Sequence, residues 1–347
     1  MKPNKQNPDF LHLGVKLLKW YDSHARELPW RATKDPYKIW ISEVVLQQTQ
    51  VRQGMGHYLR FVERFPDVRT LASAHPDEVL LYWKGLGYYS RALNLHKAAQ
   101  QIMKDYEGIF PMVYKDVLSL KGVGPYTASA ICSMAYGEAV AAVDGNFYRV
   151  LSRLFADGYD ISGAGAFAYF SALALRLMPV DRAGDFNQAM MDLGAGVCRP
   201  KAPLCGECPL SEDCLALGVG RVMDFPVKMR KTKTTDLLLD YYFVFYGESF
   251  VVRQRGEDFI WKRLYEFPSR FSSAWRGDFI GVRDVKHQLS HKNLRLSIKS
   301  VRMESFEALL AFAESEGLEV VTLKQAEAKS FPKPLENFIE YWAEKKG

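Results

Sequence analysis

Four of the five cysteines in the chain lie within one short stretch, spaced Cys198-x6-Cys205-x2-Cys208-x5-Cys214. Prolines inside this stretch prevent a continuous helix, so we expect an irregular loop on which four thiolates can converge. A tetrahedral zinc site and an iron–sulfur cluster both use four such soft ligands. Zinc sites commonly have two closely paired cysteine units and this loop has one, so the spacing leaves zinc and iron–sulfur open.

The composition is that of a globular protein with more than one domain. The chain of 347 residues is about 2.3 times a typical domain of ~150 residues, and 48% hydrophobic with 25% charged residues argues against general disorder. No apolar run approaches the ~18 residues of a membrane span, and the polar start lacks a secretory pattern. We therefore expect a cytoplasmic protein with no membrane partner. The net charge of +6 is compatible with a polyanionic partner but does not require one.

The apolar pattern changes once along the chain. Segments with a 3.6-residue apolar period, separated by Gly, Pro and Asp, continue to about residue 219. A stretch rich in Lys and Arg follows, and beyond it short aromatic and β-branched segments alternate as strands do. The prediction is a helical domain over residues 1–219, a charged linker over 220–236 and an α+β domain over 237–347.

A glycine turn joins two of the predicted helices at Gly122-Val123-Gly124. Glycines permit a positive φ, which leaves backbone N–H groups pointing outward, and the following helix adds the positive end of its dipole. Such a turn can hold one DNA phosphate. The alternative is an ordinary helix–helix corner with a glycine cap.

Two carboxylates lie in contrasting sequence environments. Glu43 lies within a predicted helix over 39–51 and has apolar neighbours, so burial should raise its pKa and make it a proton donor near neutrality. Asp144 precedes a predicted helix, where the helix dipole and free N–H groups favour its ionised form. One neutral and one charged acid is the pairing that breaks glycosidic bonds. Taken singly, a helical glutamate is usually a solvated surface residue and an aspartate before a helix is usually a simple cap.

These features together resemble one family. A Gly-Val-Gly hairpin, an Asp before a helix about twenty residues later, and the four-cysteine spacing resemble the helix-hairpin-helix DNA glycosylase superfamily with its 4Fe–4S cluster. Further segments look like those of MutY-type adenine DNA glycosylases, namely Leu28–Arg31, Trp40–Val51, Gly85–Tyr89 and Phe186–Gly194. The resemblance covers residues 28–214. It implies a mainly helical catalytic region of two subdomains with an iron–sulfur loop at 198–214.

The resemblance implies catalytic roles for four residues. Glu43 would protonate adenine at N7 and so make it a leaving group. Asp144 would stabilise the sugar cation or trap it covalently. Tyr126 and Asn146 would form hydrogen bonds around the developing charge.

The resemblance also implies contacts with a base that has left the DNA stack. An aromatic side chain and a compact amide suit the gap, because they replace lost stacking without reading sequence. Without the family, Trp30 and Tyr88 would be read as core residues. The implied contacts are Trp30, Arg31 and Gln188 for the flipped adenine, Leu46, Gln48 and Tyr88 for the stack, and Gly122, Val123 and Gly124 for a phosphate.

Tyr126 indicates the reaction type. In relatives resembling endonuclease III this position holds a lysine that forms a Schiff base and cleaves the strand, and a phenol cannot form an imine. We therefore predict a monofunctional glycosylase that leaves an abasic site. Weak strand cleavage through Lys121 or another lysine stays open.

The second domain resembles the Nudix-like unit of MutY enzymes, through the segment Trp261–Pro268. The glutamate-rich Nudix helix is absent after Pro268, so no Mg²⁺ site for pyrophosphate hydrolysis is expected and the domain should recognise DNA. Family members have Phe-Ser-His in a strand-linking loop, where this chain has Leu289-Ser290-His291. Ser290 and His291 remain available to read an oxidised guanine.

The overall prediction is a monomeric DNA repair enzyme, nucleoid-associated when acting, that removes adenine mispaired with 8-oxoguanine in double-stranded DNA. One alternative is a bifunctional glycosylase/lyase of the endonuclease III kind. Others are a non-catalytic iron–sulfur DNA-binding or redox-sensing protein and a nucleotide hydrolase centred on the second domain.

Overall fold

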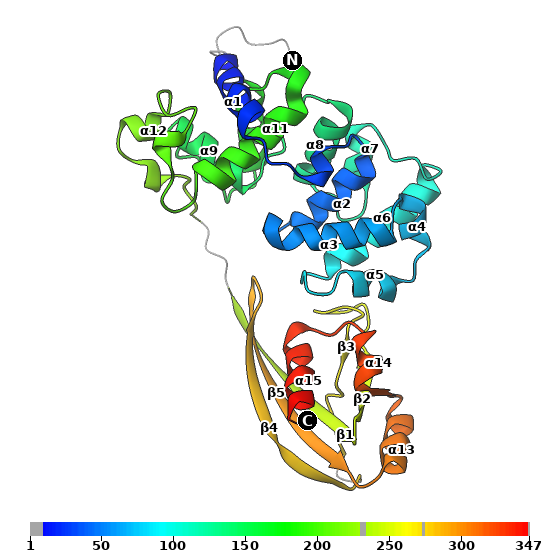
Figure 1. The fold of residues 1–347 in the computed structure, drawn as a ribbon. Coiled ribbons are helices and arrows are strands. Elements are labelled where there is room, and N and C mark those ends of the chain that lie inside the picture. Colours follow the sequence, from blue (N-terminus) through cyan, green and yellow to red (C-terminus); the bar gives the residue numbers. More distant parts are fainter. Residues whose placement is uncertain (1–9, 230–233, 273–274, 346–347) are drawn as a thin grey trace. The chain divides into compact units, whose positions relative to one another are not determined.

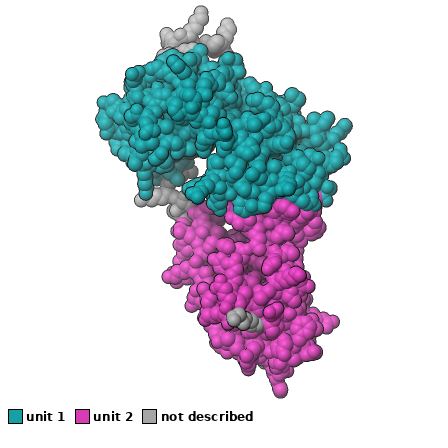
Figure 2. Space-filling model, viewed as in Figure 1, with its two compact units in different colours: residues 1–73, 97–231 teal, residues 74–96, 232–347 magenta. Residues whose placement is uncertain are grey.

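The computed structural model describes residues 10–229, 234–272 and 275–345. The chain divides into two compact units, one of residues 1–73 and 97–231 and the other of residues 74–96 and 232–347 (Figure 2). The division differs from the sequence-based bounds because residues 74–96 group with the C-terminal part. Within the linker predicted over 220–236, residues 230–233 lie outside the described part of the chain.

The first unit is helical (Figure 1). The helix α6 (Ser90–Asp105) begins in the second unit and continues into the first. The longer helices of the first unit are α1 (Leu11–His24), α2 (Pro36–Leu46), α3 (Val51–Arg64), α8 (Pro125–Tyr136), α9 (Gly145–Leu154), α10 (Ala166–Leu175) and α11 (Ala183–Asp192). Shorter elements are η1 (Pro29–Arg31), α4 (Val68–Ser73), α7 (Tyr114–Ser119), η2 (Val180–Arg182), a π-helical turn η3 (Leu193–Val197), η4 (Cys205–Glu207), α12 (Leu215–Gly218) and η5 (Val222–Asp224).

Local sequence explains where the functional helices begin. Asp35 caps α2, since its carboxylate accepts the N–H of Tyr37, and Pro36 fills the first helical position. Pro125 does the same for α8 after Gly124, and Asp144 caps α9. These three helix starts lead into the segments that carry the predicted catalytic residues.

Apolar faces hold these helices in place. Phe147 on α9, Phe170 on α10 and Phe186 on α11 meet α1 in one fully buried cluster. The helix α2 is buried on nearly every side between α3 and α8, as an apolar helix in the middle of a domain should be.

The helix predicted over 39–51 is two helices in the structure. The first, α2, ends at Leu46 and α3 begins at Val51, with Gln48 between them at a φ of 58°. The break between the two helices lets α3 pack closely against the end of α2. A Cβ atom at Gly54 would lie 2.8 Å from a methyl group of Leu46, so a larger residue there would require the Leu46 side chain to shift.

The second unit is built on a mixed six-stranded sheet. In the sheet order β3-β2-β1-β5-β4, only β1 and β5 are parallel, and β6 adds to β2. The strands are β1 (Thr235–Tyr246), β2 (Ser249–Gln254), β3 (Tyr265–Glu266), β4 (Gly277–Gln288), β5 (Lys292–Met303) and β6 (Glu319–Thr322). The helices are α5 (Pro76–Tyr82), α13 (Phe306–Glu316), α14 (Leu323–Glu327) and α15 (Lys333–Glu344).

Alternation along β1 creates two cores, one on each face of the sheet. Tyr241 and Phe243 point toward α15, where they pack with Trp342. Val244 points the other way and packs with Phe312 of α13. Strand β4 was not predicted from the sequence, because most of its side chains are exposed and its alternation is weak.

None of the helices in the described part of the chain combines the length and apolar character that crossing a membrane requires.

Candidate active site

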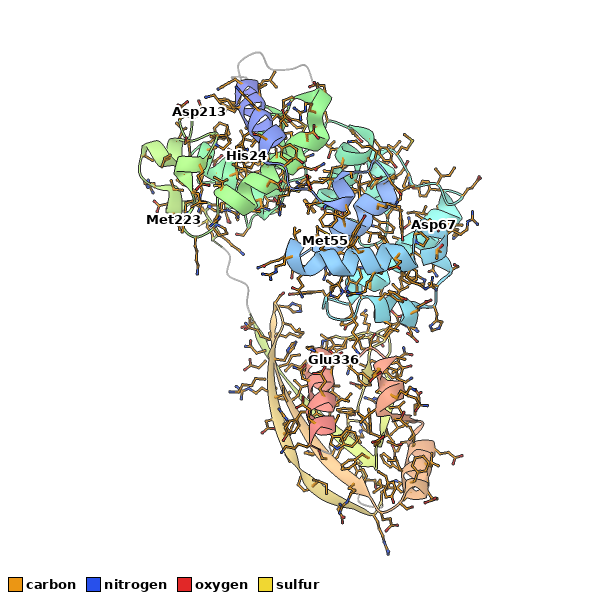
Figure 3. The ribbon with its side chains drawn as sticks, viewed as in Figure 1. His24, Met55, Asp67, Asp213, Met223 and Glu336 are labelled. Carbon is orange, nitrogen blue, oxygen red and sulfur yellow. The ribbon has the colours of Figure 1, made fainter. Side chains whose placement is uncertain are left out.

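A cavity of about 450 Å³ opens between the helices of the first unit. Its walls come from η1, α2, the turn after α2, the start of α3, both ends of α8, the start of α9, α11 and η3. Figure 3 shows the dense side-chain packing of these helices, with Met55 marking α3. The predicted residues that line the cavity are Trp30, Arg31, Glu43, Leu46, Tyr126, Asp144, Asn146 and Gln188.

Glu43 lies within α2 and is 6% exposed. The pKa of Glu43 is raised to about 7, mainly by burial. The nearby carboxylate of Asp144 also raises this pKa, while the hydrogen bond from Tyr126 and the charge of Arg31 lower it. The phenol of Tyr126 donates a hydrogen bond to Oε2 of Glu43 at 2.5 Å. Glu43 can therefore hold a proton near neutral pH and release it to a bound group. Its pKa is raised, as the apolar neighbours in the sequence predict.

Asp144 caps α9 with both carboxylate oxygens engaged. Oδ1 accepts the backbone N–H groups of Asn146 and Phe147 at 2.8 and 2.9 Å, and Oδ2 accepts the side-chain amide of Asn146 at 2.7 Å. These bonds and the charge of Arg149 lower the pKa of Asp144, as the cap predicts. Burial is the larger effect and raises its pKa overall, which the sequence analysis did not anticipate.

The two carboxylates line the same cavity, with the buried proton donor on α2 and the hydrogen-bonded aspartate at the start of α9. A positive charge developing on a bound molecule would be stabilised by Asp144, while Glu43 supplies a proton. The arrangement suits acid-assisted cleavage of a glycosidic bond.

The remaining walls hold residues that suit a planar base. Trp30 is buried and meets Tyr58 edge to face, with ring centroids 5.0 Å apart. The amide oxygen of Gln188 accepts the Tyr21 hydroxyl at 2.9 Å, which leaves its amide nitrogen to donate. Arg31 forms a two-pronged ion pair with Asp192.

The sequence analysis assigned no role to Tyr21, Arg26, Asp192 or Met191, which line or support this cavity. One signal could have found Asp192. It lies four residues after Gln188, so both share one face of a helix.

The side chain of Arg149 connects the start of α9 to the cysteine loop. Arg149 donates to the side-chain oxygen of Asn146 at 2.8 Å and to the carbonyl oxygens of Gly194 and Cys198 at 2.7 Å each. A Cβ atom at Gly194 would lie 2.5 Å from that of Asn146, so this contact requires glycine. Asp144, through Asn146, is thus joined to the backbone beside the first cysteine.

The four clustered cysteines line one small cavity with the buried Arg153. None forms a disulfide, and Nη1 of Arg153 lies 3.4 Å from Sγ of Cys198. Burial raises the pKa of the Cys208 thiol to about 11. Arg153 also approaches Met223, labelled in Figure 3, and donates to carbonyl oxygens of the loop. Across the described residues, no three His, Cys, Asp or Glu side chains are placed so that they could hold a metal ion.

The glycine turn has the predicted form with one correction. Gly122 has a φ of 77°, whereas Gly124 is extended with a φ of −97° and so does not use the left-handed region. Gly124 is the residue before α8, whose start has no side-chain cap. Val123 is buried between the two glycines.

Three predicted DNA contacts lie in the second unit instead. Tyr88, Ser290 and His291 line another cavity of about 450 Å³. The hydroxyls of Tyr88 and Ser290 are 2.6 Å apart, a short hydrogen bond. Leu289 packs against the sheet core, so the loop between β4 and β5 is anchored despite its departure from the family pattern. Gln48 lines neither cavity, although its neighbours Leu46 and Thr49 line the first.

Comparison with known proteins places this site in context. Residues 41–162 match the model of the HhH-GPD superfamily base excision DNA repair proteins. The chain is 31% identical over 342 residues to an adenine DNA glycosylase of Buchnera aphidicola subsp. Acyrthosiphon pisum, covering 93% of this chain and 95% of the relative. It is 43% identical over 209 residues to the adenine DNA glycosylase of Homo sapiens, covering 58% of this chain and 38% of that protein.

Solved structures agree with the fold of the helical part. A thermostable thymine-DNA glycosylase has a TM-score of 0.56 and 31% identity, covering 60% of this chain and 96% of that one. An endonuclease III structure in a non-covalent DNA complex has a TM-score of 0.53 at 22% identity, covering 60% and 95%, which shows a shared fold alone.

The raised pKa of Glu43 predicts a pH-dependent cost to stability. The folded protein holds this proton up to about pH 7, whereas an unfolded glutamate loses it near pH 4.5. Stability from this group is therefore complete below pH 4.5 and declines as pH rises toward 7. We compare the change that Glu43→Gln causes in the free energy of unfolding at the two pH values. This change should be more favourable at pH 8 than at pH 4.5 by about 2–3 kcal/mol.

Denaturant unfolding at both pH values measures this difference. Glu63→Gln, on the exposed surface of α3, is the matched control and should show no such dependence. An equal effect of Glu43→Gln at both pH values would contradict the raised pKa.

Proposed function

Since the chain belongs to the adenine DNA glycosylases of the HhH-GPD superfamily, we propose that it hydrolyses the N-glycosidic bond of adenine paired with 8-oxoguanine in double-stranded DNA. The observation that carries the proposal is the shared cavity of Glu43 and Asp144, one poised to donate a proton near neutrality and the other held by three hydrogen bonds. The cytoplasmic location and the monomeric state predicted from the sequence are part of the proposal.

Glu43 protonates the adenine so that it leaves as a neutral base. As the bond to the sugar breaks, the sugar takes on positive charge and Asp144 stabilises it, either electrostatically or by forming a covalent intermediate. Tyr126 keeps Oε2 of Glu43 occupied, which leaves the other oxygen to deliver the proton. Asn146 fixes the Asp144 carboxylate from the side.

The cavity has the size and lining for a base turned out of the duplex. Its volume of about 450 Å³ exceeds that of a purine, and Trp30 offers an apolar wall with Arg31 and Gln188 beside it. Among the described residues, no lysine lines this cavity. The cavity lining therefore offers no amine for a Schiff base with the sugar, which favours a monofunctional enzyme over the endonuclease III-like alternative.

The second unit supplies the recognition of 8-oxoguanine. Tyr88 offers an exposed ring for stacking, and its hydroxyl is fixed by Ser290. Ser290 and the exposed His291 provide hydrogen-bonding groups beside it. An oxidised guanine differs from guanine at O8 and at N7–H, which such groups can distinguish.

The cysteine loop fits a 4Fe–4S cluster. Cys198, Cys205, Cys208 and Cys214 are the metal-binding side chains that line their cavity, without carboxylate or imidazole, so the donor set is entirely soft. A single zinc ion needs four sulfurs about 2.3 Å from one point, whereas in a cluster each thiolate binds a different iron. The cluster would fix the loop that packs on α9, and the loop and the glycine turn would contact phosphates.

Three predictions test the proposed function, and the first of these concerns the two carboxylates. In single-turnover reactions with duplex oligonucleotides containing adenine opposite 8-oxoguanine, we expect Glu43→Gln and Asp144→Asn each to lose about 10³-fold in adenine release. Both should still bind the duplex. Glu63→Gln controls for the loss of a glutamate charge.

Free adenine and strand breaks are scored separately, with borohydride trapping as a third readout. Adenine release by Glu43→Gln at the wild-type rate would remove the proton-donor role. A trapped covalent adduct with strand cleavage would favour the bifunctional alternative. DNA binding without adenine release by the wild-type protein would favour the non-catalytic one.

The second prediction concerns recognition of the oxidised base. Ser290→Ala and Tyr88→Phe each remove one hydroxyl of the 2.6 Å pair, and we expect each to reduce the preference for adenine opposite 8-oxoguanine over adenine opposite guanine by about 5- to 10-fold. The double variant should lose less than the product of the single losses, because both act through one hydrogen bond.

Ser297→Ala, on β5 within the same unit, is the control for removing a serine hydroxyl. An unchanged preference in Ser290→Ala, in Tyr88→Phe and in the double variant would assign recognition of the oxidised base to other residues.

The third prediction concerns the cluster. The purified protein should contain ~4 irons and ~4 acid-labile sulfides per chain, and Cys198→Ala should lose them. Cys132→Ala, in the helical core, should keep them. One zinc per chain without sulfide would contradict the cluster.

A further inference from the structure

We propose that Asp192 is a positioning residue for the reaction, which holds the Arg31 guanidinium in the adenine cavity and balances its charge beside Glu43. The inference rests on the proposed function, because it requires Glu43 to be the proton donor for adenine. Asp192 is the last residue of α11 and is 4% exposed.

The contacts of Asp192 form a two-sided clamp. Arg31 donates to Oδ2 from Nη1 at 2.7 Å and to Oδ1 from Nη2 at 2.8 Å, which is the paired geometry that fixes a guanidinium plane. Arg26 also donates to Oδ1, from Nε at 2.8 Å and from Nη2, and its backbone N–H lies 3.4 Å from Oδ2. One buried carboxylate therefore orients two arginines.

Both arginines line the adenine cavity, which separates this clamp from an ordinary structural ion pair. The Arg31 guanidinium lies 5.7 Å from the ring centre of Tyr21, whose hydroxyl in turn holds Gln188. Asp192 thus anchors a small network that orients Arg31 and Gln188, two of the residues proposed to contact adenine. Carboxylate loss would free Arg31 to turn about its long side chain.

Charge gives Asp192 a second effect. The charged or titratable groups that act on Glu43 are Tyr126 of α8, Asp144 at the start of α9 and Arg31 of η1. Arg26 and Arg52 line the same cavity. Without Asp192, the cations of Arg31 and Arg26 lose their shared counter-charge. An uncompensated Arg31 favours ionised Glu43 and opposes the formation of protonated adenine.

The test compares the full-length wild-type protein with Asp192→Asn and Asp192→Glu. Single-turnover adenine release from a duplex with adenine opposite 8-oxoguanine is measured between about pH 5 and pH 9. For Asp192→Asn we expect a rate about tenfold lower at neutral pH, with the alkaline fall in rate moved down by about one pH unit. Asp192→Glu keeps the charge but displaces Arg31 by one methylene, so the fall should return to its wild-type pH while the rate stays reduced.

Asp185→Asn is the matched control. Asp185 lies on the same helix as Asp192, and the substitution removes its ion pair with Arg182. Its pH profile should match that of the wild type. A folded Asp192→Asn with the wild-type rate and pH profile would overturn the proposal. Should Asp192→Asn fail to fold, Asp192→Glu decides: a wild-type rate would refute positioning, and a reduced rate with an unmoved profile would support it. Absence of adenine release by the wild type would instead refute the proposed function.

Discussion

The burial of one glutamate inside an apolar helix is the constraint on which the active site depends. Glu43 lies in α2 among buried neighbours, and the hydroxyl of Tyr126 is its closest hydrogen-bonding partner. A carboxyl group in such a place is stable as the neutral acid and costly as the anion. The same burial keeps the carboxyl group protonated near neutral pH, which the proposed role of Glu43 as proton donor requires.

The helix α9 gives the opposite carboxylate its place. Asp144 is fixed as the cap of that helix, Asn146 and Arg149 tie it to η3, and Arg153 reaches the cysteine loop one turn further along. Each of these residues is four or fewer positions from the next, so one helix joins Asp144 to the contacts with the cysteine loop. Hydrogen bonds through the side chains of Asn146 and Arg149 therefore link Asp144 to the carbonyl oxygen of Cys198.

The second unit has a different logic. Its sheet buries one set of β1 side chains under α15 and the alternate set under α13, which leaves the loop between β4 and β5 free to present Ser290 and His291. Residues 74–96 join this unit and bring Tyr88 to Ser290. No sequence pattern predicts the hydrogen bond between Tyr88 and Ser290, because the two residues are 202 positions apart and neither lies on a periodic apolar face.

The sequence by itself determined the helical class of the first part, the α+β class of the second, the cysteine loop, the cap at Asp144 and the family, since these follow from local spacing and turn residues. It placed eight of the residues that line the active-site cavity. The break at Gln48 and the extended Gly124 are local features that the apolar spacing did not reveal. The Asp192 clamp was decided only by tertiary structure, because Asp192 lies 161 and 166 positions from its two arginines. The net pKa of Asp144 was decided the same way, because burial depends on the surrounding helices, whereas the cap depends on its own.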